Sequence, residues 1–530
     1  MTFFSLVCLV GFLSSCSDEV TLKTLPYIFR PVNFNATLNG TSVTVSWAKV
    51  DSAVSYTLEV SKDSVLFLNP VIKITTPNLN YTQELAGATS YFARIRANAS
   101  DSTKSSKFNQ TLSFKTPSEN IFGVNIPVMT ALHTIDVKWQ PKANVTKLVL
   151  TASDNTVTNI AIPADAALAG EISIPDLANA NYTVQIYNND ILRGNSSILV
   201  EGDYLLKAGD DLPTTMTNAT PGQVIILSPG VSFAMGGGTY RLGKNIKVRG
   251  LLPGNLPVIS MTTGTPTVTS SMLGFVDGSL IDYIKFENLD FAGYCENNTA
   301  AVKIGYLFNN NVMTNVKSLS FKNCKLHNFG NTPMRVQGGR GQIIDTLTFN
   351  KCVINDIGFS STYAIVNSNS ADFINNINFT NSTVYNFKGS LVLRTGQTLS
   401  SITISNCTIN QGMQDPGSAR YLIDANTAVF QGTGSITIKN SILGQTGGLL
   451  GANGMRYVTG TPVAITGCYF TSDYVDDPVP IGATSTSIKA SMTAYSGAST
   501  ALWNGPTTGD FNLKDTAFKG KGVAGDLRWY

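Results

Sequence analysis

Short segments in which two apolar residues alternate with polar ones recur from about residue 202 to the end of the chain. Clear copies run Leu-Ser-Phe-Lys-Asn-Cys from Leu319 and Ile-Thr-Ile-Ser-Asn-Cys from Ile402. Alternation with a period of two indicates strands, and no helical period lies between the copies. A strand repeat at this spacing predicts a solenoid in which each coil stacks on the one before. The copies begin, 25 to 35 residues apart, at Ile284, Leu319, Leu347, Ile377, Ile402, Ile436 and Val463.

The residue types at each repeat position explain how such coils would stack. The two apolar residues point into a shared core, and the polar residues between them face solvent. The fifth position is asparagine in five copies and Gly467 in another, and these residues tolerate the left-handed backbone of a corner; Lys351 is the exception. Side-chain amides stacked at such a corner also hydrogen-bond along the axis. The asparagines are Asn288, Asn323, Asn381, Asn406 and Asn440.

Cysteine usage follows the repeat rather than a disulfide framework. The sixth position is Cys or Ser in six of the seven copies, which predicts a column of small buried side chains. The cysteines form no Cys-x-x-Cys pairs, and thiols placed one per coil do not converge on one ion. A zinc or redox site is therefore not expected. The cysteines of the column are Cys324, Cys352, Cys407 and Cys468.

These features resemble the right-handed parallel β-helix of pectate lyases, including its asparagine ladder, over roughly residues 201–530. The segment from Pro221 to Gly230, followed by Thr239-Tyr240, resembles the first coil of many polysaccharide lyases. The closing run from Gly520 to Tyr530 resembles the end of an uncharacterised lipoprotein family from bacterial glycan-utilisation systems. The resemblance specifies the fold, whereas a fold alone says little about chemistry.

The region before the repeat is built of short alternating strands. Val43–Trp47 and Tyr91–Arg96 alternate in and out over residues 27–117. Trp47, with Leu85 six residues before Tyr91, resembles the fibronectin type III pattern, in which the tryptophan fills the core and the tyrosine forms a corner hydrogen bond.

A second module with a weaker form of the same pattern follows over residues 118–200. Ile135–Trp139 repeats the tryptophan strand, and Leu177 precedes Tyr182 by five residues. Neither sandwich has a cluster of His, Cys or acidic residues with catalytic spacing, so both are expected to be spacers, with glycan binding as the alternative. The predicted fold class is therefore all-β: two fibronectin type III-like sandwiches followed by a right-handed parallel β-helix.

The N-terminus carries a targeting signal. Thr2 to Phe12 is apolar but too short to span a membrane, and Leu13-Ser14-Ser15-Cys16 follows it. This run resembles a bacterial lipobox, which implies a signal peptide over 1–15, lipidation of Cys16 and a tether over 16–26. Ser17-Asp18-Glu19 resembles the signal that exports lipoproteins to the outer face of the outer membrane. The alternative is an ordinary secretory signal that contains a cysteine.

Composition excludes other classes of protein. A hydrophobic fraction of 43% supports real cores and excludes disorder. Only 13% of residues are charged and the net charge is +3, so no nucleic-acid partner is expected. The expected partners are an acidic polysaccharide, the membrane through the lipid anchor alone, and other glycan-uptake proteins.

Cations on the strands after each corner are the candidate catalytic residues. Lys303, Arg335 and Arg394 alternate with apolar residues, so their side chains are expected to face outward. Lyases of the resembled fold use an Arg or Lys to remove a proton beside a uronate carboxylate, while Ca²⁺ or another cation neutralises that carboxylate. Arg340, in a Gly-Gly-Arg-Gly loop, and Asp424 are candidates for binding substrate. The alternative is that these charges only solubilise the surface.

Acidic residues give little support for Ca²⁺ or for hydrolysis. Asp424 alone lies on a comparable strand, so no metal site is assigned and Ca²⁺ is expected only if the protein is a lyase. An inverting glycosidase of the same fold is the alternative suggested by Asp473, Asp476 and Asp477, because such enzymes use two separated carboxylates as acid and base. The companion sequence motifs of that family are absent. If the protein is an enzyme, a lyase is therefore favoured over a hydrolase.

Three functions stay open. The leading one is a cell-surface lipoprotein that binds an acidic polysaccharide along the β-helix face, with cleavage of that polysaccharide left open. A pure binding protein would present aromatic platforms such as Tyr294, Tyr306 or Tyr385 to solvent. A lyase would place Lys303, Arg335 or Arg394 close to another titratable group in a cleft. A structural or adhesive stalk would leave this face flat and uncharged.

Overall fold

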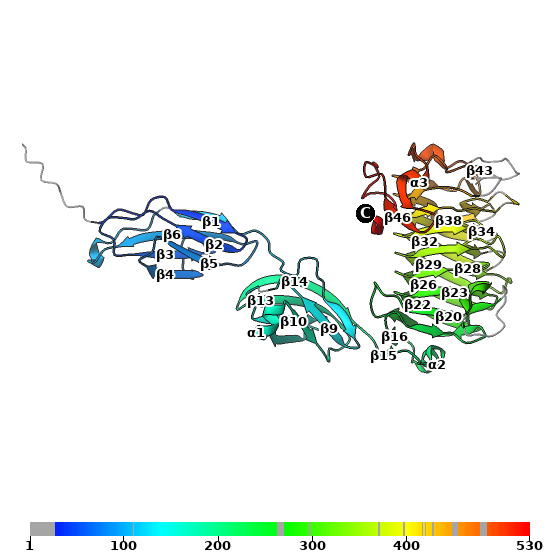
Figure 1. Cartoon of the computed structure of the whole chain (residues 1–530), viewed down its shortest axis with the longest axis horizontal. Helices are drawn as coiled ribbons and strands as arrows, with labels where there is room; N and C mark the ends of the chain where they lie inside the picture. Colours follow the sequence, from blue (N-terminus) through cyan, green and yellow to red (C-terminus); the bar gives the residue numbers. More distant parts are fainter. Residues whose placement is uncertain are drawn as a thin grey trace, which may run out of the picture. The chain divides into compact units, whose positions relative to one another are not determined.

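The computed structural model describes residues 27–530, except 110, 142, 262–269, 296–297, 369–371, 396–397, 416, 419, 427–428, 448–453 and 477–484. Cys16 and the expected signal peptide lie outside the described residues. The chain is all-β, with two N-terminal sandwiches and a C-terminal region of long parallel sheets, so the predicted fold class is confirmed (Figure 1).

The first sandwich consists of two antiparallel sheets, in which strands such as β2 and β6 alternate between buried and more exposed residues. Trp47 and Tyr56 lie in its core with ring centroids 5.6 Å apart. The Ala86 N–H donates to the Tyr91 hydroxyl at 3.1 Å, which is the corner bond that the tyrosine predicts. One sheet is β1 (Asn35–Asn39), β2 (Ser42–Ser46) and β5 (Asn80–Glu84), and the other is β4 (Ile72–Thr76), β3 (Ser55–Ser61), β6 (Ser90–Asn98) and β7 (Leu112–Lys115), with the 3₁₀ turn η1 (Ser102–Lys104).

The second sandwich has the same two-sheet plan. Its short helix α1 (Ala164–Ala169) ends at Gly170, whose φ of 79° gives the left-handed C-cap that glycine favours. Its sheets are β12 (Glu171–Ile174), β9 (Thr134–Lys138) and β8 (Val128–Ala131), and β11 (Val157–Ala161), β10 (Lys147–Ala152), β13 (Ala180–Asn188) and β14 (Ile191–Val200). The chain divides into two compact units, Met1–Ile126 with Lys138–Ile172 and Tyr182–Ser197, and Pro127–Val137 with Ser173–Asn181 and Ile198–Tyr530.

From Tyr204 onward the chain winds through three sheets in turn, which makes a parallel β-helix. Figure 1 shows β22, β26, β29 and β32 of the first sheet in order along the helix axis. Sheet 1 contains β15 (Tyr204–Leu206), β16 (Val224–Leu227), β19 (Ile246–Gly250), β22 (Ser279–Glu287), β26 (Thr314–Lys322), β29 (Ile343–Asn350), β32 (Phe373–Thr380), β35 (Thr398–Ser405), β38 (Val429–Lys439) and β41 (Val463–Thr466).

The other two sheets follow sheet 1 in each coil. Sheet 2 contains β17 (Ser232–Ala234), β20 (Val258–Met261), β23 (Asp290–Cys295), β27 (Lys325–His327), β30 (Val353–Ile357), β33 (Thr383–Phe387), β36 (Thr408–Asn410), β39 (Ile442–Leu443), β42 (Tyr469–Phe470) and β44 (Thr493–Ala494), with β24 (Asn298–Lys303) antiparallel to β23. Sheet 3 contains β18 (Tyr240–Leu242), β21 (Ser271–Phe275), β25 (Tyr306–Asn310), β28 (Thr332–Val336), β31 (Val366–Ser368), β34 (Val392–Arg394), β37 (Ile423–Ala425), β40 (Met455–Tyr457) and β43 (Ser485–Thr486).

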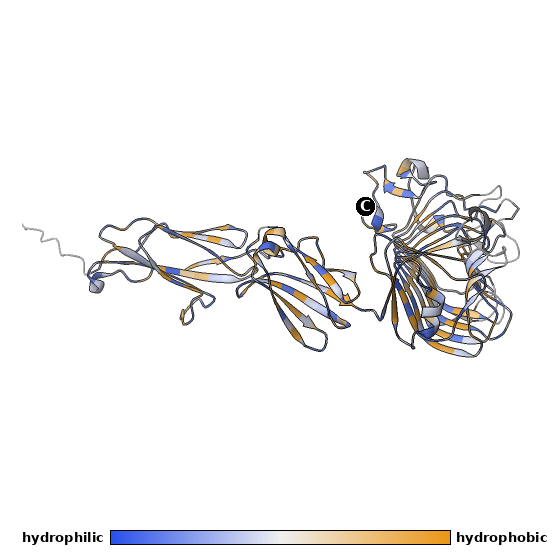
Figure 2. Ribbon diagram, turned by 60° about the horizontal axis from the view of Figure 1, so that its bottom comes forward, coloured by the Kyte–Doolittle hydropathy of each residue, from blue (hydrophilic) through white to orange (hydrophobic). Residues whose placement is uncertain are grey.

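The register of sheet 1 places like residues over like. Phe286, Phe321, Phe349 and Phe379 pair in sequence, and their rings stack with centroids 5.4, 5.1 and 5.0 Å apart. Bands of hydrophobic and hydrophilic residues alternate along strands of the β-helix (Figure 2). The shared core predicted from the period-two pattern is therefore present.

The corner after sheet 1 also forms as predicted. All seven fifth-position residues, Lys351 included, are left-handed, with φ between 47° and 64°. The backbone N–H groups of the six corner residues before Gly467 bond to the next coil; Asn323 N, for example, donates to Asn350 O at 2.8 Å. Behind the corner the four cysteines are free and buried, and burial raises the pKa of the Cys352 and Cys407 thiols to about 12.

Both ends of the solenoid carry extra structure. Helix α2 (Leu212–Asn218), N-capped by Asp211, buries Leu212 and Met216 in the core that continues into the first coils. At the other end, a C-terminal segment packs on β33 of sheet 2. The C-terminus lies beside β46 (Figure 1). This segment follows β44 and contains α3 (Ser499–Leu502), β45 (Trp503–Gly505), β46 (Asp510–Leu513) and η3 (Leu527–Trp529), while the 3₁₀ turn η2 (Lys489–Ser491) precedes β44.

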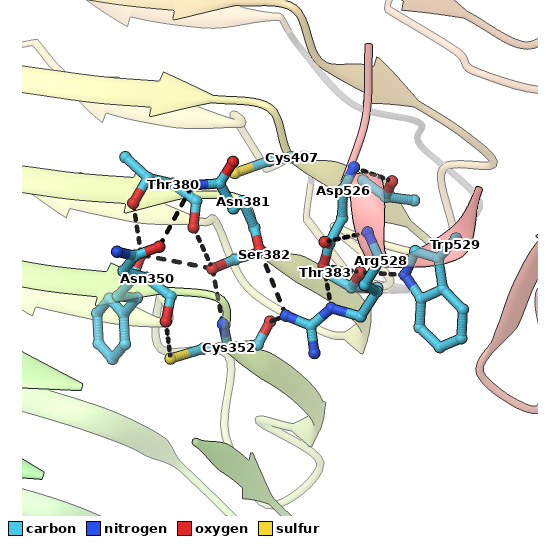
Figure 3. A network of polar contacts seen from close by, with 12 residues as sticks. Asn350, Cys352, Thr380, Asn381, Ser382, Thr383, Cys407, Asp526, Arg528 and Trp529 are labelled. Carbon is cyan, nitrogen blue, oxygen red and sulfur yellow. Dashed lines mark hydrogen bonds and ion pairs between the residues drawn. The ribbon is translucent and has the colours of Figure 1, made fainter. Parts of the chain in front are cut away.

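The last residues of the chain bind the corner and the start of sheet 2 (Figure 3). Thr383 Oγ1 donates to Asp526 Oδ2 at 2.9 Å and accepts from Trp529 Nε1 at 2.8 Å. Arg528 Nη2 donates to the carbonyls of Cys352 and Asn381, both at 3.3 Å. The tail therefore ties together coils that lie far from it in sequence.

Candidate ligand-binding face

The outer column of sheet 3 brings two of the predicted residues into line. Arg335 on β28 and Asp424 on β37 belong to the same register column, three coils apart. Arg335 is half-buried, whereas Asp424 is buried. In coil order the column is Asn309, Arg335, Asn367, Leu393, Asp424 and Arg456.

The expectation that Arg394 faces outward is wrong. Arg394 shares its register column with Val336 and Ser368, which face inward, and its side chain is fully buried. Burial lowers the pKa of its guanidinium to about 10, and the buried carboxylate of Asp372 acts in the opposite direction. The negative charge of Asp372 offsets part of the cost of burying the Arg394 guanidinium. Because Arg394 faces the interior of the coil, a substrate on the outer face cannot reach it.

Arg335 lies between two tyrosines. Its Nη1 donates to the Tyr306 hydroxyl at 3.0 Å, and its guanidinium carbon lies 4.2 Å from the centroid of the Tyr363 ring. Its Nε is buried without a hydrogen-bond partner. Within the described ranges, Arg335 forms no ion pair with a carboxylate. The guanidinium is thus held by aromatic rings and a hydroxyl, and no carboxylate in the described part of the chain compensates its charge.

Two of the tyrosines expected as open platforms are covered. Only 4% of Tyr306 is exposed, and burial raises the pKa of its hydroxyl. Tyr385 packs against Phe511 of the returning C-terminal segment, with centroids 5.4 Å apart. Tyr363, which no repeat position indicated, is the half-buried ring beside Arg335. Sequence reasoning missed it because it lies in the long loop before β31.

Lys303 and Tyr294 pair across the β23–β24 hairpin. Lys303 Nζ lies 5.5 Å from the ring centroid of Phe359, an exposed aromatic side chain. The half-buried Tyr294 ring meets the His327 ring edge-on at 5.9 Å. Lys303 and Phe359 therefore add a second cation and an open aromatic ring to the loops on this side of the β-helix.

His327 is fixed by its neighbours. Its Nε2 lies 2.8 Å from Asp290 Oδ1, and its Nδ1 lies 2.8 Å from the Asn328 amide nitrogen. Asp290 and Asn328 therefore lie close to the two ring nitrogens, although the contact between Nε2 and Asp290 lacks hydrogen-bond geometry. These neighbours favour a structural role over that of a general base.

The cations further along the face are compensated by acids. Arg456 binds Asp424 through two contacts of 2.9 and 2.6 Å and lies 4.5 Å from the Tyr421 ring centroid. Arg420 binds Asp415 at 2.6 Å and donates to Thr362 Oγ1 at 2.6 Å. Asp424 is therefore the partner of an arginine and not an open ligand.

Arg340 is exposed in the loop that follows β28. The glycines around it, Gly338, Gly339 and Gly341, all have positive φ, which explains the glycine-rich run. No hydrogen bond or ion pair of the described structure joins Arg340 to the Arg335 site.

Acidic residues do not assemble into a metal site. Across the described ranges, no group of three or more His, Cys, Asp or Glu side chains could hold a metal ion. Asp473 accepts hydrogen bonds from Ser499 N and Oγ, and Asp476 accepts one from Ile488 N, so both carboxylates hold local backbone in place. Asp477 lies outside the described residues. The described residues therefore contain no acidic cluster that fits the Ca²⁺ that a lyase of the resembled fold would imply.

Sequence and structure comparisons identify relatives of unknown function. Residues 232–387 match the domain of unknown function DUF4957, and residues 402–529 match the domain of unknown function DUF5123. No curated protein matches the chain. No helix in the described part of the chain is long and apolar enough to cross a membrane.

Two solved structures from chicken are similar to part of the chain. The CNTN1 FN1–FN3 domains share 12% identity over 33% of this chain and 68% of their own, with a TM-score of 0.16. The two-domain fibronectin type III segment of tenascin shares 13% identity over 32% of this chain and 98% of its own, with a TM-score of 0.17.

Proposed function

We propose that the outer face of sheet 3 binds an acidic polysaccharide around Arg335. The observation behind this proposal is the uncompensated guanidinium, which is stacked on Tyr363 and bonded to Tyr306. A partly buried charge without a counterion is costly, and a ligand carboxylate would supply the missing partner. Arginine also presents a planar fork of donors that matches a carboxylate.

The surroundings suit a sugar chain. Phe359 and Tyr363 offer aromatic faces, which pack against the apolar faces of sugar rings. Strands of one sheet repeat at ~4.8 Å, so the six strands from β25 to β40 span about 24 Å, enough for several sugar units. Arg420 and Arg456 are already paired with acids, and we expect them to contact uncharged parts of the polymer.

Lyase activity is the second candidate, favoured by the 3.0 Å contact between Arg335 and the Tyr306 hydroxyl. Burial raises the pKa of Tyr306, so this hydroxyl stays protonated at neutral pH and could donate a proton but not remove one. No acidic cluster for a metal accompanies the pair in the described ranges. Binding without cleavage is therefore the proposal that we prefer, and a structural or adhesive stalk is the third possibility.

We further propose that the protein is a lipoprotein on the outer face of the outer membrane. The support is the run Leu13-Ser14-Ser15-Cys16 followed by Ser17-Asp18-Glu19. Lipidation of Cys16 would place the sandwiches between the membrane anchor and the β-helix along the chain. Other proteins of a glycan-uptake system are the partners that this location suggests.

Affinity electrophoresis with polygalacturonate, alginate and hyaluronan, each beside its carboxyl-reduced form, tests the proposal. We expect at least one acidic polymer to retard the protein and its reduced form not to. Arg335→Gln should abolish retardation, and Arg241→Gln, an exposed arginine at the start of the same sheet, should not. Equal binding of acidic and reduced polymers, or full binding by Arg335→Gln, would contradict the proposal.

Ultraviolet absorbance of unsaturated products, followed in the same samples with added calcium, separates the two candidates. A signal that Arg335→Gln abolishes would establish a lyase. Retardation without a signal would establish a binding protein. If no acidic polymer is retarded, the stalk is the better description.

A further inference from the structure

The first sandwich exposes an apolar surface where the described chain begins. Tyr27, Phe29 and Val32 are 49%, 71% and 63% exposed. They border a surface hollow of about 520 Å³ whose lining also includes Arg30, Lys49, Asp51 and Lys104. We call this surface the amino-terminal patch. Its cations outnumber its acid three to one.

The patch is held on ordered backbone. Ile28 N donates to Lys104 O and Ala48 N donates to Val32 O, both at 2.9 Å. Ile28 also packs against the core of the sandwich. Tyr27 and Phe29, on either side of Ile28, therefore project from an anchored segment.

This combination of side chains has the chemistry of a membrane-interface surface. Aromatic and aliphatic side chains enter the headgroup region, while Lys and Arg beside them attract anionic lipid. A contiguous apolar patch rimmed by charges is also uncommon on a surface that stays in water. A sugar-binding role fits less well, because the exposed aliphatic Val32 offers no ring to stack on.

The length of the preceding chain keeps the patch near the expected anchor. Segment 16–26 separates the patch from Cys16, and eleven residues reach at most about 38 Å when fully extended. A surface tethered this close to a bilayer meets it at a high effective concentration, so weak intrinsic affinity is enough.

We infer that the amino-terminal patch rests on the lipid headgroups of the membrane that anchors the chain. The ligand is an anionic bilayer surface. This inference rests on the proposed lipidation of Cys16, which has its own test: labelling of the full chain with a fatty-acid analogue, absent from Cys16→Ala. The labelling test addresses lipidation alone, and the vesicle test below addresses the bilayer contact alone, so either can fail without the other.

The bilayer contact is tested with the chain from Cys16 to Tyr530, coupled through Cys16 to maleimide lipid in vesicles of phosphatidylglycerol and phosphatidylethanolamine. Cys295→Ser is included throughout so that Cys16 is the reactive thiol, since Cys324, Cys352, Cys407 and Cys468 are buried. Phe29→Trp reports on the patch. Leu168→Trp, at an exposed position of the second sandwich, is the matched control.

We expect vesicle coupling to shift Phe29→Trp emission to the blue and brominated lipid to quench it, with neither change in Leu168→Trp. Replacing Arg30 and Lys49 with Gln should reduce the quenching. Equal quenching of both reporters, or none for Phe29→Trp, would overturn the inference. A blue-shifted emission before vesicles are added would also overturn it, because segment 16–26 would then be the occupant of the patch.

Discussion

Asn381 Nδ2 donates a 3.3 Å hydrogen bond to Asn350 Oδ1, one residue before the corner position that Lys351 holds. In an earlier coil, Asn323 Nδ2 reaches the corner residue Asn288 itself at 2.9 Å. The amide ladder thus shifts by one residue at Lys351. The backbone does not shift, because Lys351 N still donates to Thr380 O at 3.0 Å. The corner depends first on its left-handed backbone and only then on its side chain.

Lys351→Asn is expected to stabilise the β-helix by about 0.5–1 kcal/mol, because asparagine adopts the left-handed conformation at lower cost than lysine. Lys351→Ala removes the same charge without that advantage and should give no gain. Thermal unfolding, with the β-helix transition assigned by hydrogen exchange, measures both. A gain in both variants would point to charge rather than backbone conformation.

The phenylalanine stack should be the most sensitive part of the β-helix core. Phe349 is fully buried between Phe321 and Phe379, with centroids 5.1 and 5.0 Å away. Phe349→Ala is expected to cost about 3–5 kcal/mol, since it leaves a cavity that neighbouring coils cannot fill. Thr348→Ala, on the solvent side of the same strand, should cost far less. Urea denaturation of both variants checks the difference, and equal losses would contradict the stacked core.

An ionic cluster joins the two sandwiches. Arg193 Nη1 lies 2.7 Å from Glu84 and its Nε lies 2.7 Å from Glu119, while its side chain is only 9% exposed. Arg193→Met should destabilise the joint by about 3–5 kcal/mol, because two carboxylates lose their cation. Limited proteolysis near residue 118 should speed up accordingly. Lys147→Met, which removes an exposed pair with Asp190, should leave the cleavage rate unchanged.

Docking of the C-terminal tail should weaken as pH rises. Burial raises the pKa of Asp526, although Arg528 and Thr383 favour its charged form. A released tail has the ordinary Asp value of about 3.9. Because the docked pKa is the higher one, this contribution to docking is fully present below the pKa of the released tail. It is lost as pH rises through the docked pKa. Hydrogen exchange of residues 520–530 at several pH values measures the slope.

Asp526→Asn should flatten that slope, since the side chain then carries no charge at any pH. A wild-type tail that docks more firmly at higher pH would show that the ion pair with Arg528, at 2.7 Å, outweighs the burial of Asp526.

The parts of the fold that follow from local backbone chemistry were predictable from sequence. The corners at Asn288 and Asn440 needed only the left-handed tolerance of asparagine, and the core needed only the period-two pattern. The side of the sheet that Arg394 faces was not predictable in this way. Leu393 and Arg394 are adjacent, and the buried Asp372, from the preceding coil, accompanies the inward arginine.

The candidate site was predicted only in part, because the repeat pattern determines how strand residues are placed but not how loop residues are placed. Arg335 lies on a repeated strand, so its outward position could be inferred from alternation. Tyr363 and Arg420 lie in loops of unequal length between sheets 2 and 3, and the repeat does not determine where such loops fold. Their contacts with Arg335 and Thr362 come from packing between coils.

The role of Tyr363 in ligand binding can be separated from that of its hydroxyl. The Tyr363 ring stacks on the Arg335 guanidinium at 4.2 Å and so keeps its donors oriented. Tyr363→Phe preserves the ring and should leave affinity for the acidic polymer nearly unchanged. Tyr363→Ala should weaken binding by about 1–2 kcal/mol, the range of a partly desolvated cation–π contact. Calorimetry at two salt concentrations measures the loss, and the remaining affinity should still fall with added salt because Arg335 keeps its charge. Equal losses in both variants would mean that the hydroxyl, not the ring, contacts the polymer.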